Sequence, residues 1–296
     1  MLLDRPISVK YILNTIKFDM LYVLIISLVV YFLTLRIGRV FPEISLVIPT
    51  FIGTSISILL SFKLNHSYER WWEARKIWGA IVNDSRSLVL QLQGMVAEGN
   101  EAVVKKMAHR QIGWCYCLGQ SLRNSDPVAN LESFIPKEEL DSVQSHQNVP
   151  LALLQLHTLD LAELRQTNRL DVFGHVQLGN TLARLTDSMG KAERIKSTIF
   201  PVTYRLFLHL LIYVFVITLT ISLSAVGQFR ATLLLILSAA FFLLEKTATH
   251  MQDPFDNKPT DTAVTAIART IEINLKQLLK ETDIPPAQQP TGFYLS

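Results

Sequence analysis

The chain has 296 residues, of which 49% are hydrophobic and 18% are charged, and its mean hydropathy is +0.28. The formal net charge is only +3, and no basic tract is interleaved with aromatic residues, so the composition argues against a nucleic-acid-binding protein. The mixture of apolar and charged residues suits a membrane protein with a substantial aqueous domain.

Four long apolar runs flank a polar middle. The first two cover about 19–35 and 44–62, and the other two cover about 200–226 and 231–244. Each approaches or exceeds the length that crosses a bilayer core as a helix, which is about 20 residues. We therefore expect an integral membrane protein of the all-α class with four transmembrane helices.

The second run carries two stripes at i, i+4 and i+8. One consists of small residues, which let helices approach closely in membranes: Gly53, Ser57 and Ser61. The other lies beside it: Thr54, Ile58 and Phe62. Both stripes are packing surface in one interpretation. In the other, one stripe packs between subunits and the second faces an axial pore, where rings of Ile and Phe form a hydrophobic constriction that gates by dewetting.

The middle of the chain is predicted to be helical, because no alternating strand pattern competes. Helices are expected over about 67–93, 101–122, 136–143 and 150–165, then a break over 167–174 and a last helix that leads to Pro201. A turn-rich connector covers 253–261, and an amphipathic helix covers 262–280. The predicted organisation is an N-terminal part with two spans (1–62), a cytosolic helical domain (63–199), two further spans (200–245) and a cytosolic C-terminal segment (246–296).

Lysine and arginine predict the topology. They gather before the first span, after the second, before the third and after the fourth: Arg5, Lys10 and Lys17; Lys63, Arg70, Arg75 and Lys76; Lys191, Arg194 and Lys196; Lys246 and Lys258. The positive-inside rule then places both termini and the whole middle in the cytoplasm. We expect a multi-pass protein of a cell inner membrane or plasma membrane.

Catalytic motifs are absent from the sequence. It holds no GxSxG, P-loop, HExxH or paired-glycine nucleotide loop, so an enzyme is not expected. Cys115 and Cys117 are interpreted as two reduced thiols on a helix rather than a zinc site, and the histidines of the middle have no ligand spacing. Neither a cofactor nor a metal site is expected. Without an acid or base inside the membrane, four spans cannot easily form their own aqueous path, which argues against a proton-coupled transporter and favours a pore between copies.

Three stretches resemble one known family. The most specific is 65–79, with the sequence NHSYERWWEARKIWG, directly after the second span. Glu193-Arg194-Ile195 is followed by Pro201 and Tyr204, and Asp-Pro-Phe-Asp-Asn at 253–257 is followed by Thr-Ile-Glu-Ile-Asn-Leu at 270–275. In this order they resemble the bestrophin family, particularly its bacterial branch, over nearly the whole chain.

The resemblance implies a homopentameric ion channel whose five second spans surround one axial pore. It places a hydrophobic neck at Thr54, Ile58 and Phe62, where Thr54 is smaller than the usual bulky residue, so the outer ring is expected to be wider and wetter. It also implies a second restriction in the cytosolic domain, at Val172 or Phe173. The implied partners are other copies of the chain, membrane lipid and permeant monovalent ions, either anions such as chloride or cations.

A calcium site of the kind that animal bestrophins carry is not expected. The carboxylates that could form it are separated by Asn257, Lys258 and Pro259: Asp253, Asp256 and Asp261. Two other functions stay open. The spans could anchor and oligomerise a cytosolic scaffold or sensor without conduction, or the protein could be a small-molecule facilitator.

Overall fold

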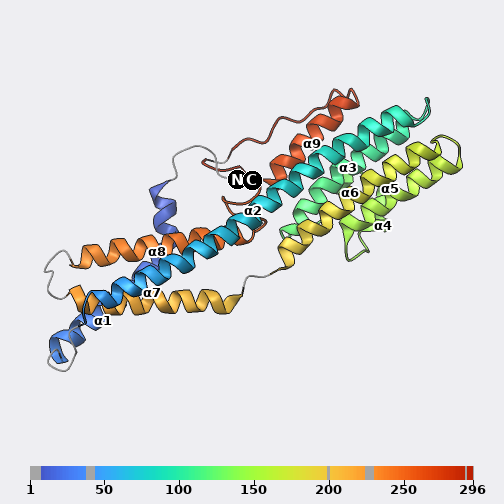
Figure 1. Ribbon diagram of the computed structural model, residues 1–296. Helices are drawn as coiled ribbons and strands as arrows, with labels where there is room; N and C mark the ends of the chain where they lie inside the picture. Colours follow the sequence, from blue (N-terminus) through green and yellow to red (C-terminus); the bar gives the residue numbers. More distant parts are fainter. Residues whose placement is uncertain (1–7, 38–43, 199–200, 224–229, 291, 296) are drawn as a thin grey trace. The chain divides into compact units, whose positions relative to one another are not determined.

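The computed structural model describes residues 8–37, 44–198, 201–223, 230–290 and 292–295. These residues form helices and connections, with an isolated bridge between Val96 and Leu170, which confirms the all-α class. The α-helices, drawn in Figure 1, have these bounds: α1 Val9–Ile37, α2 Val47–Met95, α3 Glu101–Leu122, α4 Lys137–Val143, α5 Val149–Gln166, α6 Val172–Ser197, α7 Val202–Ser222, α8 Arg230–Gln252 and α9 Val264–Leu278. A short 3₁₀ helix covers Leu131–Ser133.

The chain divides into two compact units. The membrane unit consists of the described residues of 5–70 and 199–252, and the helical domain consists of those of 71–198 and 253–296. Helix α2 contributes its first part to the membrane unit and its second part to the helical domain. Arg5, the link 38–43 and the end of the predicted third span, 224–226, lie outside the described residues.

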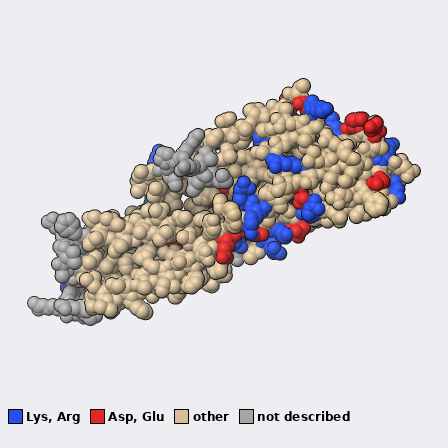
Figure 2. All heavy atoms as spheres, turned by 45° about the horizontal axis from the view of Figure 1, so that its top comes forward, with Lys and Arg blue, Asp and Glu red and all other residues tan. Residues whose placement is uncertain are grey.

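The membrane unit contains α1, the first part of α2, α7 and α8. Four of the described helices are long and apolar enough to cross a bilayer, as the sequence predicts. Large apolar side chains such as Phe32, Phe207 and Ile236 are exposed, because lipid rather than water is their expected surroundings. On the face shown in Figure 2, the α1, α7 and α8 part carries almost no charged side chains.

The predicted second span and the helix predicted after it are one continuous helix. Hydropathy falls after Phe62, but no glycine or proline occurs between Gly53 and Gly79 to break the hydrogen-bonding pattern. At Lys63 the sequence therefore changes from apolar to polar, but the helix does not end there.

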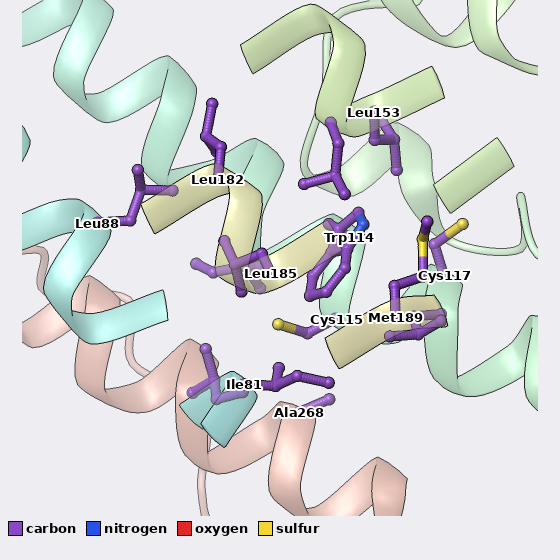
Figure 3. Close-up of a cluster of buried hydrophobic side chains, with 14 of the residues drawn as sticks. Ile81, Leu88, Trp114, Cys115, Cys117, Leu153, Leu182, Leu185, Met189 and Ala268 are labelled. Atoms are coloured by element: carbon purple, nitrogen blue, oxygen red, sulfur yellow. The ribbon is translucent and has the colours of Figure 1, made fainter. Parts of the chain in front are cut away.

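The helical domain is built around α3, which packs against α5, α6 and α9. Trp114 is completely buried, and its ring nitrogen donates a hydrogen bond of 3.0 Å to the carbonyl oxygen of Pro150. Figure 3 shows Trp114 among side chains of several helices, including Leu153, Leu185 and Met189. Both cysteines are buried free thiols in this core, as the sequence suggests.

A buried ionic cluster links α3, α4 and α5. Arg110, whose side chain is 1% exposed, binds Glu139 through two nitrogens and Asp160 at 2.7 Å. Lys106 binds Asp160 at 2.9 Å. His157 is completely buried, and burial, with Arg110 and Lys106 nearby, holds its pKa well below the usual value. His157 is therefore a neutral core residue at neutral pH.

Candidate ion pathway on helix α2

The three predicted neck residues share one exposed face of α2. Ile58 is 54% exposed and Phe62 is 61% exposed, and Thr54 is also exposed. The Thr54 hydroxyl donates to the carbonyl oxygen of Thr50 in its own helix at 2.9 Å. The i, i+4, i+8 spacing lines these side chains up along the helix. The other helices of the membrane unit leave this apolar face uncovered.

The opposite face of α2 is packed inside the membrane unit. Ile56 is completely buried and Leu60 nearly so. Gly53 lies against two aromatic rings, since a Cβ atom placed there would be 3.2 Å from Phe215 and 3.9 Å from Phe241. A Cβ atom at position 53 would therefore require the Phe215 ring of α7 to shift by a few tenths of an ångström, whereas its distance to Phe241 of α8 is an ordinary contact.

Two polar contacts also hold α2. The Tyr204 hydroxyl of α7 donates to the carbonyl oxygen of Leu59 at 2.8 Å. The Lys63 ammonium donates to Glu245 of α8 at 2.7 Å and to Thr249 at 2.8 Å. Close packing and these bonds fix the rotation of α2, and so fix which face it leaves exposed.

The stripe of small residues is divided between two environments. Gly53 packs against Phe215 within the chain, whereas Ser57 and Ser61 are exposed. The Ser57 hydroxyl donates to the carbonyl oxygen of Gly53 at 2.8 Å, so its polar atom is satisfied within the helix. Because Ser57 and Ser61 are small and exposed, a narrow strip of the α2 surface stays uncovered within the chain.

The Lys63–Glu245 pair is a functional candidate that sequence reasoning missed. Both side chains are almost completely buried, and His209 of α7 lies 3.4 Å from the second oxygen of Glu245. Lys246 and Asp19 form another ion pair in this unit at 3.2 Å. Sequence reasoning missed the pair because the predicted second and fourth spans end one residue before Lys63 and Glu245. In addition, no local sequence pattern links two residues that are so far apart in the chain. The two members of this buried pair therefore directly follow the predicted second and fourth spans.

The residues predicted to form a second restriction begin helix α6. Val172 and Phe173 are exposed, Phe173 to 85%, and the nearby Val176 is exposed as well. Asp171 caps the helix by accepting a hydrogen bond of 2.6 Å from the backbone N–H of Gly174. The cap starts the helix inside the predicted break and presents the two apolar side chains at its first turn.

The carboxylates of the connector after α8 are engaged in the protein. Asp253 binds Lys196 at 2.7 Å, and Asp256 binds Lys258 at 2.5 Å. Asp261 accepts the backbone N–H of Lys258 at 3.0 Å, and burial raises the pKa of Asp261 to about 6. Over the described ranges no three His, Cys, Asp or Glu side chains gather as a metal site would require.

Residues of the motif run 65–79 form structural contacts in each unit. In the membrane unit, Arg70 donates to the carbonyl oxygen of Gln252 at 2.8 Å. In the helical domain, Trp71 donates to the carbonyl oxygen of Thr260 at 2.9 Å, and Trp78 is completely buried. Arg70 thus ties α2 to the end of α8, and Trp71 ties α2 to the connector that follows it.

Comparisons with known proteins agree with this architecture. A family model described as "Bacterial/Fungal Bestrophin protein" matches residues 7–277. The "Voltage-dependent anion channel-forming protein YneE" of Escherichia coli strain K12 is 30% identical over 244 residues, which cover 82% of this chain and 80% of that protein. A protein with the same description from Ralstonia nicotianae, RSc3414, is 29% identical over 250 residues, with coverages of 82% and 80%.

The fold has solved counterparts. A bacterial bestrophin homolog from Klebsiella pneumoniae matches with a TM-score of 0.82 at 24% sequence identity, and the match covers 90% of this chain and 99% of that one. At this identity the likeness shows a common fold, including the four apolar helices and the helical domain. Together with the family model, it confirms the resemblance found in the sequence. The chain belongs to the bacterial and fungal branch of the bestrophin family.

Proposed function

We propose that the protein is a homopentameric ion channel in which five copies of α2 surround one axial pore. The observation that carries this proposal is the uncovered apolar face of α2, with Ile58 and Phe62 exposed in a unit whose opposite face is tightly packed. A ring of copies would bring these faces together around an axis. The channel-forming descriptions of the relatives support the same function.

The neck consists of three rings, one from each of Thr54, Ile58 and Phe62. Apolar rings of narrow radius expel water, so the Ile58 and Phe62 rings are the gate. Thr54 forms the wider outer ring, because its hydroxyl is bonded to its own helix and its side chain is short. Val172 and Phe173 form the second restriction in the helical domain.

The permeant species are small monovalent ions. Because the neck side chains are uncharged, the barrier to an ion in the neck comes from the loss of its hydration water and not from the sign of its charge. The anion-channel descriptions of the relatives favour anions such as chloride over cations for this chain. The basic residues around the four spans favour a cell inner or plasma membrane with both termini in the cytoplasm.

A recording from the purified protein in a planar bilayer under a salt gradient tests the function directly. We expect single-channel currents, and the reversal potential gives the sign of the carried ion. Intact, inserted protein that passes no current would contradict the channel proposal and would favour an oligomeric scaffold or sensor anchored by the spans.

The oligomeric state is the second expected result. In a single copy the face of α2 that carries Ile58 and Phe62 is exposed, whereas in a closed ring of copies it would face the shared axis. The small side chains of Ser57 and Ser61 let a neighbouring copy approach α2 closely. We expect native mass spectrometry in mild detergent to give five copies. A stable monomer would rule out the pore, and a dimer would point to a scaffold or a transporter.

Calcium independence is the third expected result. Calcium takes six to eight oxygen ligands, but Lys258 stands among the connector carboxylates and is paired with Asp256. We therefore propose that currents in excess chelator equal currents in micromolar calcium. A steep loss of current on chelation, restored by calcium and abolished by Asp256→Ala, would show that the connector binds the ion.

A further inference from the structure

The uncovered face of α2 continues beyond the neck residues. Asn65 and Glu69 come three and seven residues after Phe62, which is about one turn and about two turns further along the same helix. Both side chains are exposed, as the neck side chains are. These positions all belong to the membrane unit. One strip of α2 therefore carries the apolar neck and then, in the C-terminal direction, a polar segment with an acid.

The basic residues that flank Glu69 in the sequence are engaged with α8. Lys63 is buried and bonded to Glu245 at 2.7 Å. Arg70 is partly buried, and its Nε donates to the carbonyl oxygen of Gln252 at 2.8 Å. The positive charges that follow the second span are thus turned into the membrane unit, whereas the acid between them lies on the exposed strip.

Glu69 makes two long contacts within its own helix. One carboxylate oxygen lies 3.5 Å from the amide nitrogen of Asn65, and the other lies 3.6 Å from Nδ1 of His66. The Glu69 side chain is 64% exposed, so these contacts are weak. Further along α2, Lys76 pairs with Glu73 at 2.6 Å. Within the described part of the chain, Glu69 therefore forms no ion pair with a lysine or arginine that would offset its charge.

We propose that Glu69 forms a ring of negative charge at the C-terminal end of the neck and sets the balance between anions and cations in the pore. The inference rests on the proposed assembly, in which each copy of α2 contributes one carboxylate to the ring. Rings of Asp or Glu side chains favour cations in channels. Because the neck side chains themselves are uncharged, discrimination by the sign of the charge falls to a group outside the neck.

The distance between the ring and the neck makes the effect dependent on salt. The helix rises about 10 Å between Phe62 and Glu69. The Debye length is about 8 Å at physiological ionic strength, about 30 Å at 0.01 M and about 3 Å at 1 M. An ion at the neck therefore interacts with the ring strongly in dilute salt and weakly in concentrated salt. The ring favours cation entry over anion entry, so it limits the anion preference that the descriptions of the relatives favour.

Reversal potentials of the reconstituted full-length protein in gradients of potassium chloride test the proposal. Glu69→Gln removes the charge and nearly keeps the shape of the side chain. In dilute salt we expect it to raise the ratio of chloride to potassium permeability about threefold. Glu69→Lys reverses the charge and should raise the ratio about tenfold or more. Both increases should shrink in concentrated salt, because the charge is then screened over the distance to the neck.

Two controls isolate the charge of Glu69. Glu138→Gln, the same change at an exposed position on α4, should keep the permeability ratio of the parent. Glu69→Gln in a His66→Gln background, where the neighbouring histidine carries no charge, should give the same threefold increase over that background.

The outcomes separate the charge ring from the channel itself. A conducting parent whose permeability ratio is unchanged by both Glu69→Gln and Glu69→Lys would overturn the ring and leave the channel proposal intact. Increases of equal size in dilute and concentrated salt would also overturn it, because a ring about 10 Å from the neck must be screened. Intact, inserted parent that passes no current would instead contradict the channel proposal, and the ring with it.

Discussion

Replacing Ile58 and Phe62 together by alanine is expected to raise ion flux about tenfold or more. In the proposed pore, each ring excludes water because its side chains are apolar and narrow the path. Alanine keeps the helix but removes most of that side-chain volume, so the neck widens and wets. A fall of only about 1.4 kcal/mol in the barrier gives a tenfold increase. Flux through reconstituted liposomes, normalised to inserted protein, is the measurement.

The control removes the same two residue types elsewhere in the membrane unit. Phe207 on α7 and Ile236 on α8 are 50% and 61% exposed, as apolar as the neck residues but outside α2. The double change Phe207→Ala and Ile236→Ala should leave flux near that of the parent. If the neck variant inserts, assembles and conducts like this control, α2 does not line the gate.

Elements bounded by clear local signals could be predicted from the sequence. The helix expected at 101–122 is α3, Glu101–Leu122, because polar and glycine residues precede it and Asn124 and Pro127 follow it closely. Helix α6 starts at Val172, three residues earlier than the predicted break over 167–174 allows. The signal was present, since Asp171 is a favourable N-cap residue three positions before Gly174.

That the three candidate neck residues share one face could be predicted because they lie on one helix; that they form a neck stays a prediction. Spacing alone places Thr54, Ile58 and Phe62 on one face, and the structure shows that the rest of the chain leaves this face exposed. The contacts that orient the helix could not be predicted. Gly53 packs on aromatic rings more than 160 residues later, and a stripe of small residues does not say which helix will approach it.

Breaking the buried pair between α2 and α8 is expected to destabilise the membrane unit strongly. Lys63 and Glu245 are 2.7 Å apart and almost fully buried, so Lys63→Met leaves a carboxylate without its main partner. Loss of one member of a buried pair costs about 3–5 kcal/mol. His209, 3.4 Å from Glu245, compensates only in part. For a chain of this size, we expect the unfolding midpoint to fall by about 5 °C or more.

The double variant Lys63→Met and Glu245→Gln distinguishes loss of the pair from loss of side-chain volume. It leaves no unpaired ionised group at the centre of the contact, so it should recover much of the stability that the single change loses. Lys191→Met breaks an exposed pair with Asp187 on α6 and should shift the midpoint little. The measurement is the fraction of assembled protein that remains after heating in detergent. If Lys63→Met is as stable as Lys191→Met, the buried pair does not hold α2 in place, and packing at Gly53 with the Tyr204 hydrogen bond must fix its rotation.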